Sequence, residues 1–151
     1  MTVDIVNETT FEVNAETMNG LAAHVLKAMK VHPDADLTVV FVDEPAMEKL
    51  HIEWMDEPGP TDVMSFPMDE LRPGNDDKLT DPGLLGDVVI CPTVAEKQAE
   101  AAGHPTESEI RLLLTHGILH LLGFDHAEPD EEKAMFALQR QLLESFAAEH
   151  D

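Results

Sequence analysis

The most apolar stretch of the chain spans residues 110–124 and reads IRLLLTHGILHLLGF. The preceding residues 106–109 (TESE) have the form of a capping box, which predicts that a helix begins there. Gly123 predicts its end, because glycine readily adopts the left-handed backbone that closes a helix. Apolar residues surround this helix on most sides, which favours a central, buried position. Arg111, His116 and His120 interrupt it, and it is shorter than the ~18 apolar residues of a membrane span.

The flanking segments predict strands and helices that are interspersed without strict alternation. The predicted strands are Thr2–Val6, Leu37–Val42, Asp62–Phe66 and Leu84–Ile90. The other predicted helices are Asn14–Lys30, with Asn14 as N-cap, Glu44–Met55, Thr93–Ala102, with a second capping box at Thr93–Glu96, and Pro129–Ala147. Residues 69–82 are polar and predict a surface loop. With no repeat and no linker, the pattern predicts one α+β domain over residues 1–151, with a small mixed four-stranded sheet and packed helices.

Three of the eight histidines lie between residues 116 and 126. His116 and His120 are four residues apart on the predicted helix, so their side chains project from one face. Gly123 lets the chain turn back, and His126 can then supply a third nitrogen. Three neutral imidazoles leave a fourth position for water, as in a catalytic zinc site. A purely structural cluster is the alternative, but the spacing favours a metal site at the end of the central helix; nickel, copper or iron would also accept these ligands.

The histidine spacing is that of the H-E-x-x-H-x-x-G-x-x-H zinc proteases, with one departure. Gly117 occupies the position of the glutamate that serves as general base, so the pattern argues against peptide hydrolysis. A phosphodiester can be attacked with a metal ion stabilising the charge on its oxygens. Asp125 is the nearest candidate for a catalytic acid or base. The favoured interpretation of Asp125 is a hydrogen-bond acceptor for a ligand imidazole.

The block at 116–126 (HGILHLLGFDH), together with 60–67 (PTDVMSFP) and 85–92 (LGDVVICP), resembles the YbeY-type endoribonucleases, which are bacterial rRNA maturation factors. The resemblance implies an α+β domain with a mixed four-stranded sheet and one metal ion, usually zinc, held by His116, His120 and His126. It implies that residues 61–67 line the cleft beside the metal. Many members carry an arginine for RNA phosphate at the position that Met55 occupies here.

The same resemblance implies a cytoplasmic, single-strand-specific endoribonuclease that acts in 16S rRNA 3′-end maturation and ribosome quality control. Its expected partners are single-stranded RNA, the 16S rRNA precursor and the small ribosomal subunit, with no DNA and no membrane. A ribosome-associated assembly factor with a mainly structural metal is the alternative, which Met55 and the acidic composition favour. A metalloprotease is disfavoured by Gly117.

The chain is strongly acidic, with 31 Asp and Glu against 9 Lys and Arg and a net charge of −22. All three thirds of the chain contribute, which indicates an acidic surface and not an acidic tail. Such a surface opposes binding to phosphates, so the bound cation and a few local bases must offset the charge of an RNA substrate. Arg72, Lys49 and Arg111 are the bases nearest in sequence.

Two further features bear on location and partners. The single cysteine, Cys91, excludes an internal disulfide and permits a reducing compartment. Residues 1–10 lack the basic and apolar regions of a signal peptide, so none is expected there. Phe136, Leu143 and Phe146 form a stripe on the last predicted helix. Core packing is the favoured interpretation of this stripe, and a partner surface is the alternative.

Overall fold

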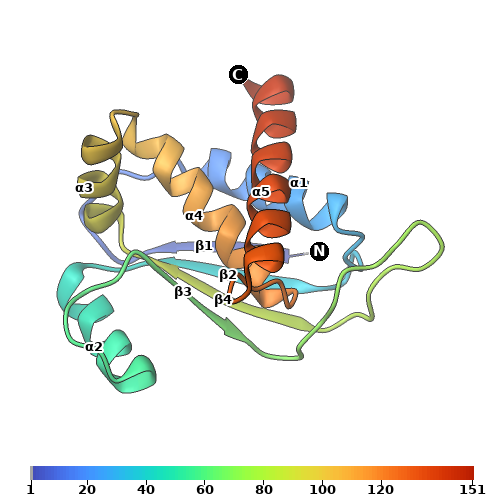
Figure 1. Cartoon of the computed structure of the whole chain (residues 1–151), viewed down its shortest axis with the longest axis horizontal. Helices are drawn as coiled ribbons and strands as arrows, with labels where there is room; N and C mark the ends of the chain where they lie inside the picture. Colours follow the sequence, from blue (N-terminus) through green and yellow to red (C-terminus); the bar gives the residue numbers. More distant parts are fainter. Residues whose placement is uncertain (1) are drawn as a thin grey trace.

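The computed structural model describes residues 2–151, which fold into one mixed sheet and five helices. The strands are β1 (Thr2–Asn7), β2 (Asp36–Phe41), β3 (Val63–Pro67) and β4 (Leu84–Ile90). The helices are α1 (Ala15–Ala28), α2 (Glu44–Met55), α3 (Pro92–Ala102), α4 (Thr106–Leu121) and α5 (Pro129–His150). Helices α1, α3, α4 and α5 lie on one side of the sheet and α2 lies on the other (Figure 1). The predicted α+β class is confirmed.

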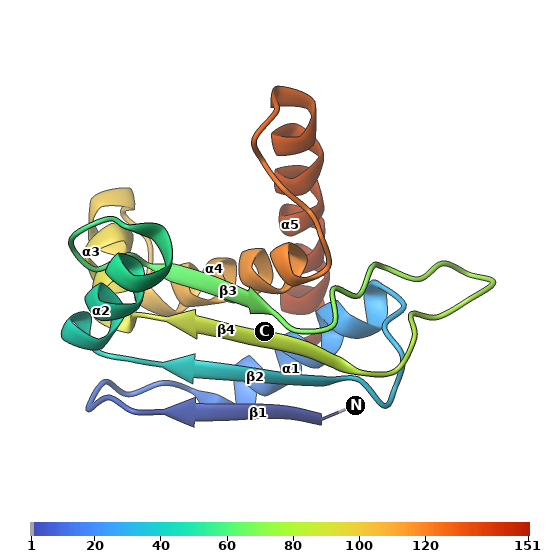
Figure 2. The same ribbon diagram turned by 90° about the horizontal axis from the view of Figure 1, so that it is seen from below.

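The sheet has the strand order β1-β2-β4-β3 (Figure 2). β1 pairs with β2 and β2 with β4 in parallel, whereas β3 runs antiparallel to β4. β3 is therefore an edge strand, with the end of α2 on one side of it and α4 on the other (Figures 1 and 2).

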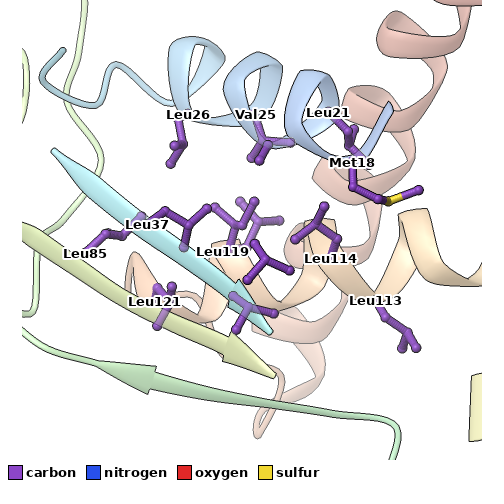
Figure 3. Close-up of a cluster of buried hydrophobic side chains, with 14 of the residues drawn as sticks. Met18, Leu21, Val25, Leu26, Leu37, Leu85, Leu113, Leu114, Leu119 and Leu121 are labelled. Carbon is purple, nitrogen blue, oxygen red and sulfur yellow. The ribbon is translucent and has the colours of Figure 1, made fainter. Parts of the chain in front are cut away.

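The core lies between the sheet and helices α1 and α4. Figure 3 shows apolar side chains of α1 and α4 directed towards β2 and β4. Alternate residues of β2 face this core: Leu37, Val39 and Phe41 are each 1% exposed or less. The predicted central helix is confirmed, because α4 contacts α1, α3, α5, β3 and β4. Among residues 2–151, no helix combines the length and the apolarity that a membrane crossing requires.

Two predicted helix caps are wrong. α3 begins at Pro92 and not with a capping box at Thr93, because proline suits the first helical position, where its missing N–H costs nothing. The Thr93 hydroxyl instead donates to Glu44 Oε2 at 2.7 Å, which ties α3 to α2. α4 follows Pro105 without a side-chain cap, and Glu109 accepts from His104 Nε2 at 3.2 Å. The predicted cap at Asn14 is confirmed, since its side chain accepts from Thr17 N at 3.1 Å.

Candidate metal centre

The last two turns of α4 and the loop after it bring three histidines together. His116 and His120 project from one face of the helix, with ring centroids 4.6 Å apart. Gly123 has φ 95°, a left-handed backbone that turns the chain back at the end of the helix. The His126 ring then lies 5.4 Å from that of His116 and 5.3 Å from that of His120. The predicted convergence of these side chains is therefore present.

One nitrogen from each ring lies within 4.8 Å of the other two, so the cluster could hold a metal ion. Ligand nitrogens that each lie ~2.0–2.1 Å from one zinc ion are at most ~4.2 Å apart, which a small rotation of a side chain achieves. Three neutral imidazoles with one open position match the donor set of a catalytic zinc site. The three histidines thus fit the zinc ion that their spacing in the sequence predicts.

A buried glutamine on α5 sets the orientation of the first histidine. Gln139 Oε1 lies 2.5 Å from Nδ1 of His116, and Gln139 is 5% exposed. The amide oxygen accepts the Nδ1–H, so the lone pair of Nε2 is free to bind a metal ion. Burial lowers the pKa of His116 and also that of His120, which favours the neutral form that a metal ligand requires. Sequence reasoning missed Gln139, because nothing local to residue 139 distinguishes it from a surface glutamine.

Replacing Gln139 with leucine should lower zinc affinity about 10- to 100-fold, because the Nδ1–H of His116 loses its acceptor and the ring loses its fixed orientation. Leucine has a similar size and suits a buried position, so the fold should persist. A competition titration with a zinc chelator measures the change. Gln139→Glu keeps an acceptor at the same place and should retain the affinity. Wild-type affinity in Gln139→Leu would show that this hydrogen bond does not support the site.

A groove of about 1620 Å³ surrounds the cluster and follows the edge of the sheet. Residues Thr61–Pro67 line it, as the resemblance implies. Trp54 and Met55 at the end of α2 line it from one side. Phe136 on α5 lines it from the other, with its ring 6.4 Å from that of His116 and 6.1 Å from that of His126. The histidine cluster therefore opens into a groove with aromatic side chains at both flanks.

Gly117 lies where α4 packs directly on β3 and β4. A Cβ at this position would lie 2.6 Å from Cγ1 of Val88, and the Gly117 carbonyl accepts a hydrogen bond from Ser65 Oγ at 2.9 Å. The side of the helix that carries Gly117 is thus covered by β3 and β4. The glutamate of a zinc protease has no room there, which gives a physical reason for the departure from the protease pattern.

Two carboxylates lie near the histidines. Asp125 Oδ1 accepts from the backbone N–H of His126 at 2.7 Å, so its contact with His126 is to the backbone and not to the imidazole. Asp62, which sequence reasoning did not single out, lines the groove, and its negative charge partly offsets the lowering of the pKa of His116. The backbone N–H of Val63 at 2.8 Å and Gln98 Nε2 at 3.2 Å hold the Asp62 carboxylate.

A family model described as endoribonuclease YbeY matches residues 4–147 of the chain. The chain belongs to this family. A relative described as endoribonuclease YbeY from Clavibacter sepedonicus is 62% identical over 147 residues, which cover 97% of this chain and 96% of the relative. A relative with the same description from Beutenbergia cavernae is 62% identical over 148 residues, which cover 98% of this chain and 99% of the relative. Another from Thermobifida fusca is 59% identical over 143 residues, which cover 95% of this chain and 92% of the relative.

Among solved structures, the solution structure of TM1509 from Thermotoga maritima resembles this YbeY-family chain with a TM-score of 0.65 and 26% sequence identity. The match covers 97% of this chain and 90% of that one. The similarity therefore extends over most of the fold. The family model and the relatives confirm the predicted family.

In this YbeY-family chain, sequence proximity is a good guide for Arg72 and a poor one for Arg111. Arg72 lies beside Gly123, which is between His120 and His126 in the sequence, since a Cβ at Gly123 would be 2.8 Å from Cζ of Arg72. Arg140, on α5, lines the groove. Arg111 is held elsewhere by Asp151 at 2.8 Å and Glu107 at 3.0 Å. Arg72 and Arg140, and not Arg111, are thus the arginines placed near the histidines.

Proposed function

We propose that this chain is a metal-dependent endoribonuclease that cuts single-stranded RNA. The observation that carries the proposal is the group of three histidine nitrogens within 4.8 Å of one another, in a groove of about 1620 Å³. The description of its relatives as endoribonucleases supports RNA as the substrate class. We extend the proposal to 16S rRNA 3′-end maturation and ribosome quality control in the cytoplasm, with the 16S rRNA precursor and small ribosomal subunit as partners. The active unit is a single domain over residues 1–151.

His116, His120 and His126 hold one divalent ion in this proposal, and three imidazoles with one open position are the ligand set of a catalytic zinc site. A metal bound there supplies a Lewis acid for the negative charge on a phosphodiester and lowers the pKa of a bound water. Gln139 keeps His116 in the tautomer that presents Nε2. Arg72 and Arg140 supply positive charge to the phosphates, the role that the family arginine cannot fill where Met55 stands.

Asp125 is the residue that we propose to exchange a proton with the attacking water or the leaving oxygen. Its carboxylate is exposed and is placed beside His126 by the hydrogen bond from the His126 backbone N–H. A carboxylate in such a position can accept a proton without disturbing the three ligands.

Metal analysis combined with cleavage of a circular single-stranded RNA tests the function, because only an endonuclease opens a circle. We expect about one zinc ion per chain, conversion of circles to linear RNA, loss of cleavage with a chelator and recovery when zinc is returned. A duplex of the same sequence should remain intact. Full cleavage by protein that has been stripped of metal would contradict the mechanism.

A ribosome assembly factor with a mainly structural metal is the second candidate. The observation that favours it is Met55, which is 58% exposed in the groove and cannot form a charged pair with phosphate. Co-sedimentation with small ribosomal subunits, together with no cleavage of the circle at any zinc concentration, would select this function over the first.

A further inference from the structure

The groove presents two exposed aromatic side chains on opposite flanks of the histidine cluster. Trp54 is 61% exposed at the end of α2, and Phe136 is 41% exposed on α5. Both line the groove that contains the three histidines. Side chains of this size are normally buried, because each exposes a large apolar area to water. Their exposure at one groove therefore calls for an occupant.

Both aromatic rings are held in place by neighbouring groups. The Trp54 ring packs edge to face on Phe66 of β3, with centroids 5.6 Å apart. Phe136 lies against the rings of His116 and His126. A ring whose edge is supported and whose face is open provides a rigid platform for a planar ligand. Such a platform loses little conformational entropy when it binds.

The charged residues of the groove and its volume indicate which ligand could stack on these rings. Asp62 and Asp87 also line the groove, and these carboxylates repel a phosphate that faces inward. Arg140 lines the groove, and Arg72 lies outside that lining, against Gly123. Among residues 2–151, neither forms an ion pair with a carboxylate, and Arg72 Nη1 donates only to the backbone carbonyls of Glu70 and Leu71, so both charges are available to phosphates. The groove is larger than the ~300–1000 Å³ of a small-molecule pocket, which suits a segment of a polymer.

We infer that the groove holds single-stranded RNA by base stacking, with one base on Trp54 and another on Phe136, while Arg72 and Arg140 contact the phosphates. This inference rests on the proposed function. Stacking is neutral with respect to charge, so it explains how a chain with a net charge of −22 holds a polyanion. Duplex RNA keeps its bases paired and stacked on one another, so the same contacts favour single strands.

The chain has one tryptophan and no tyrosine, so its fluorescence reports on Trp54 directly. Stopped-flow mixing of wild-type zinc-loaded protein with a single-stranded RNA oligonucleotide, read before cleavage proceeds, should show quenching. An abasic oligonucleotide of the same length carries the phosphates without bases, and should leave the fluorescence unchanged and bind more weakly. Quenching by the abasic strand equal to that by RNA would overturn the inference.

Substitutions give the second measurement. Trp54→Ala should raise KM for single-stranded RNA about 5- to 150-fold with little change in kcat, which corresponds to ~1–3 kcal/mol for one stacked base. Phe136→Ala should act in the same direction, and Trp54→Phe should retain most of the affinity. Ile52→Ala is the matched control, because Ile52 is 50% exposed on the same helix and lies outside the groove lining.

The possible outcomes distinguish a failure of the stacking inference from a failure of the proposed endoribonuclease function. An unchanged KM in Trp54→Ala and Phe136→Ala, with normal cleavage, would overturn the stacking and leave the proposed nuclease function supported. Quenching by RNA in a protein that cleaves no RNA would support the stacking and contradict the proposed nuclease function.

Discussion

Replacing His116 with alanine should abolish zinc binding and reduce RNA cleavage by about a thousandfold or more. The substitution removes one of three nitrogens and also leaves Gln139 without its partner. A bound metal contributes several kcal/mol to stabilisation of the transition state, and each 1.36 kcal/mol is a factor of ten in rate. Zinc content by mass spectrometry and the initial rate of cleavage of single-stranded RNA measure the two effects.

A histidine elsewhere in the fold controls for the loss of an imidazole as such. His32→Ala is suitable, because His32 lies outside the histidine cluster and its Nδ1 accepts from the backbone N–H of Asp34 at 3.0 Å. It should bind zinc and cleave RNA as the wild type does. If His116→Ala lost its zinc and kept its full rate of cleavage, the reaction would not depend on this metal centre.

Introducing glutamate at Gly117 should unfold much of the protein and should not create a protease. The Cβ alone would lie 2.6 Å from Val88, inside a packed strand, which costs about 1–3 kcal/mol. The carboxylate would also be buried without a partner, a cost of several kcal/mol. The free energy of unfolding of such a domain is only ~5–15 kcal/mol, so these two costs together cancel a large part of it. Urea unfolding with a chelator present measures the loss.

Two alanine substitutions separate the effect of the contact from that of glycine in a helix. Gly20 on α1 has ordinary space, since its Cβ would lie 3.7 Å from Phe146, so Gly20→Ala should raise stability by up to ~1 kcal/mol. Gly117→Ala gains the same helix propensity but meets Val88, and should lower stability by up to ~2 kcal/mol. Stabilisation by Gly117→Ala would show that α4 can move away from the sheet at little cost.

The elements of the fold follow closely from local patterns. The bounds of α2 and β4 agree with prediction, and the predicted N-cap at Asn14 is present. The stripe on α5 divides in a way that periodicity could not reveal. Phe146 is fully buried, whereas Phe136 is 41% exposed in the groove. Core packing is thus confirmed for one end of the stripe and wrong for the other, because one face of a long helix meets both the core and the groove.

What the sequence determined by itself was the group of candidate metal ligands. His116, His120 and His126 lie within eleven residues, and the geometry of one helix and one glycine turn is enough to bring them together. The tertiary structure alone decided what surrounds them. Gln139, Arg72 and Trp54 come from segments distant along the chain. Their positions depend on how α5 packs on α4, how the loop at 69–82 lies against Gly123 and how the end of α2 contacts β3. Local periodicity specifies which face of an element is apolar, but the neighbour of that face is chosen by packing over the whole domain.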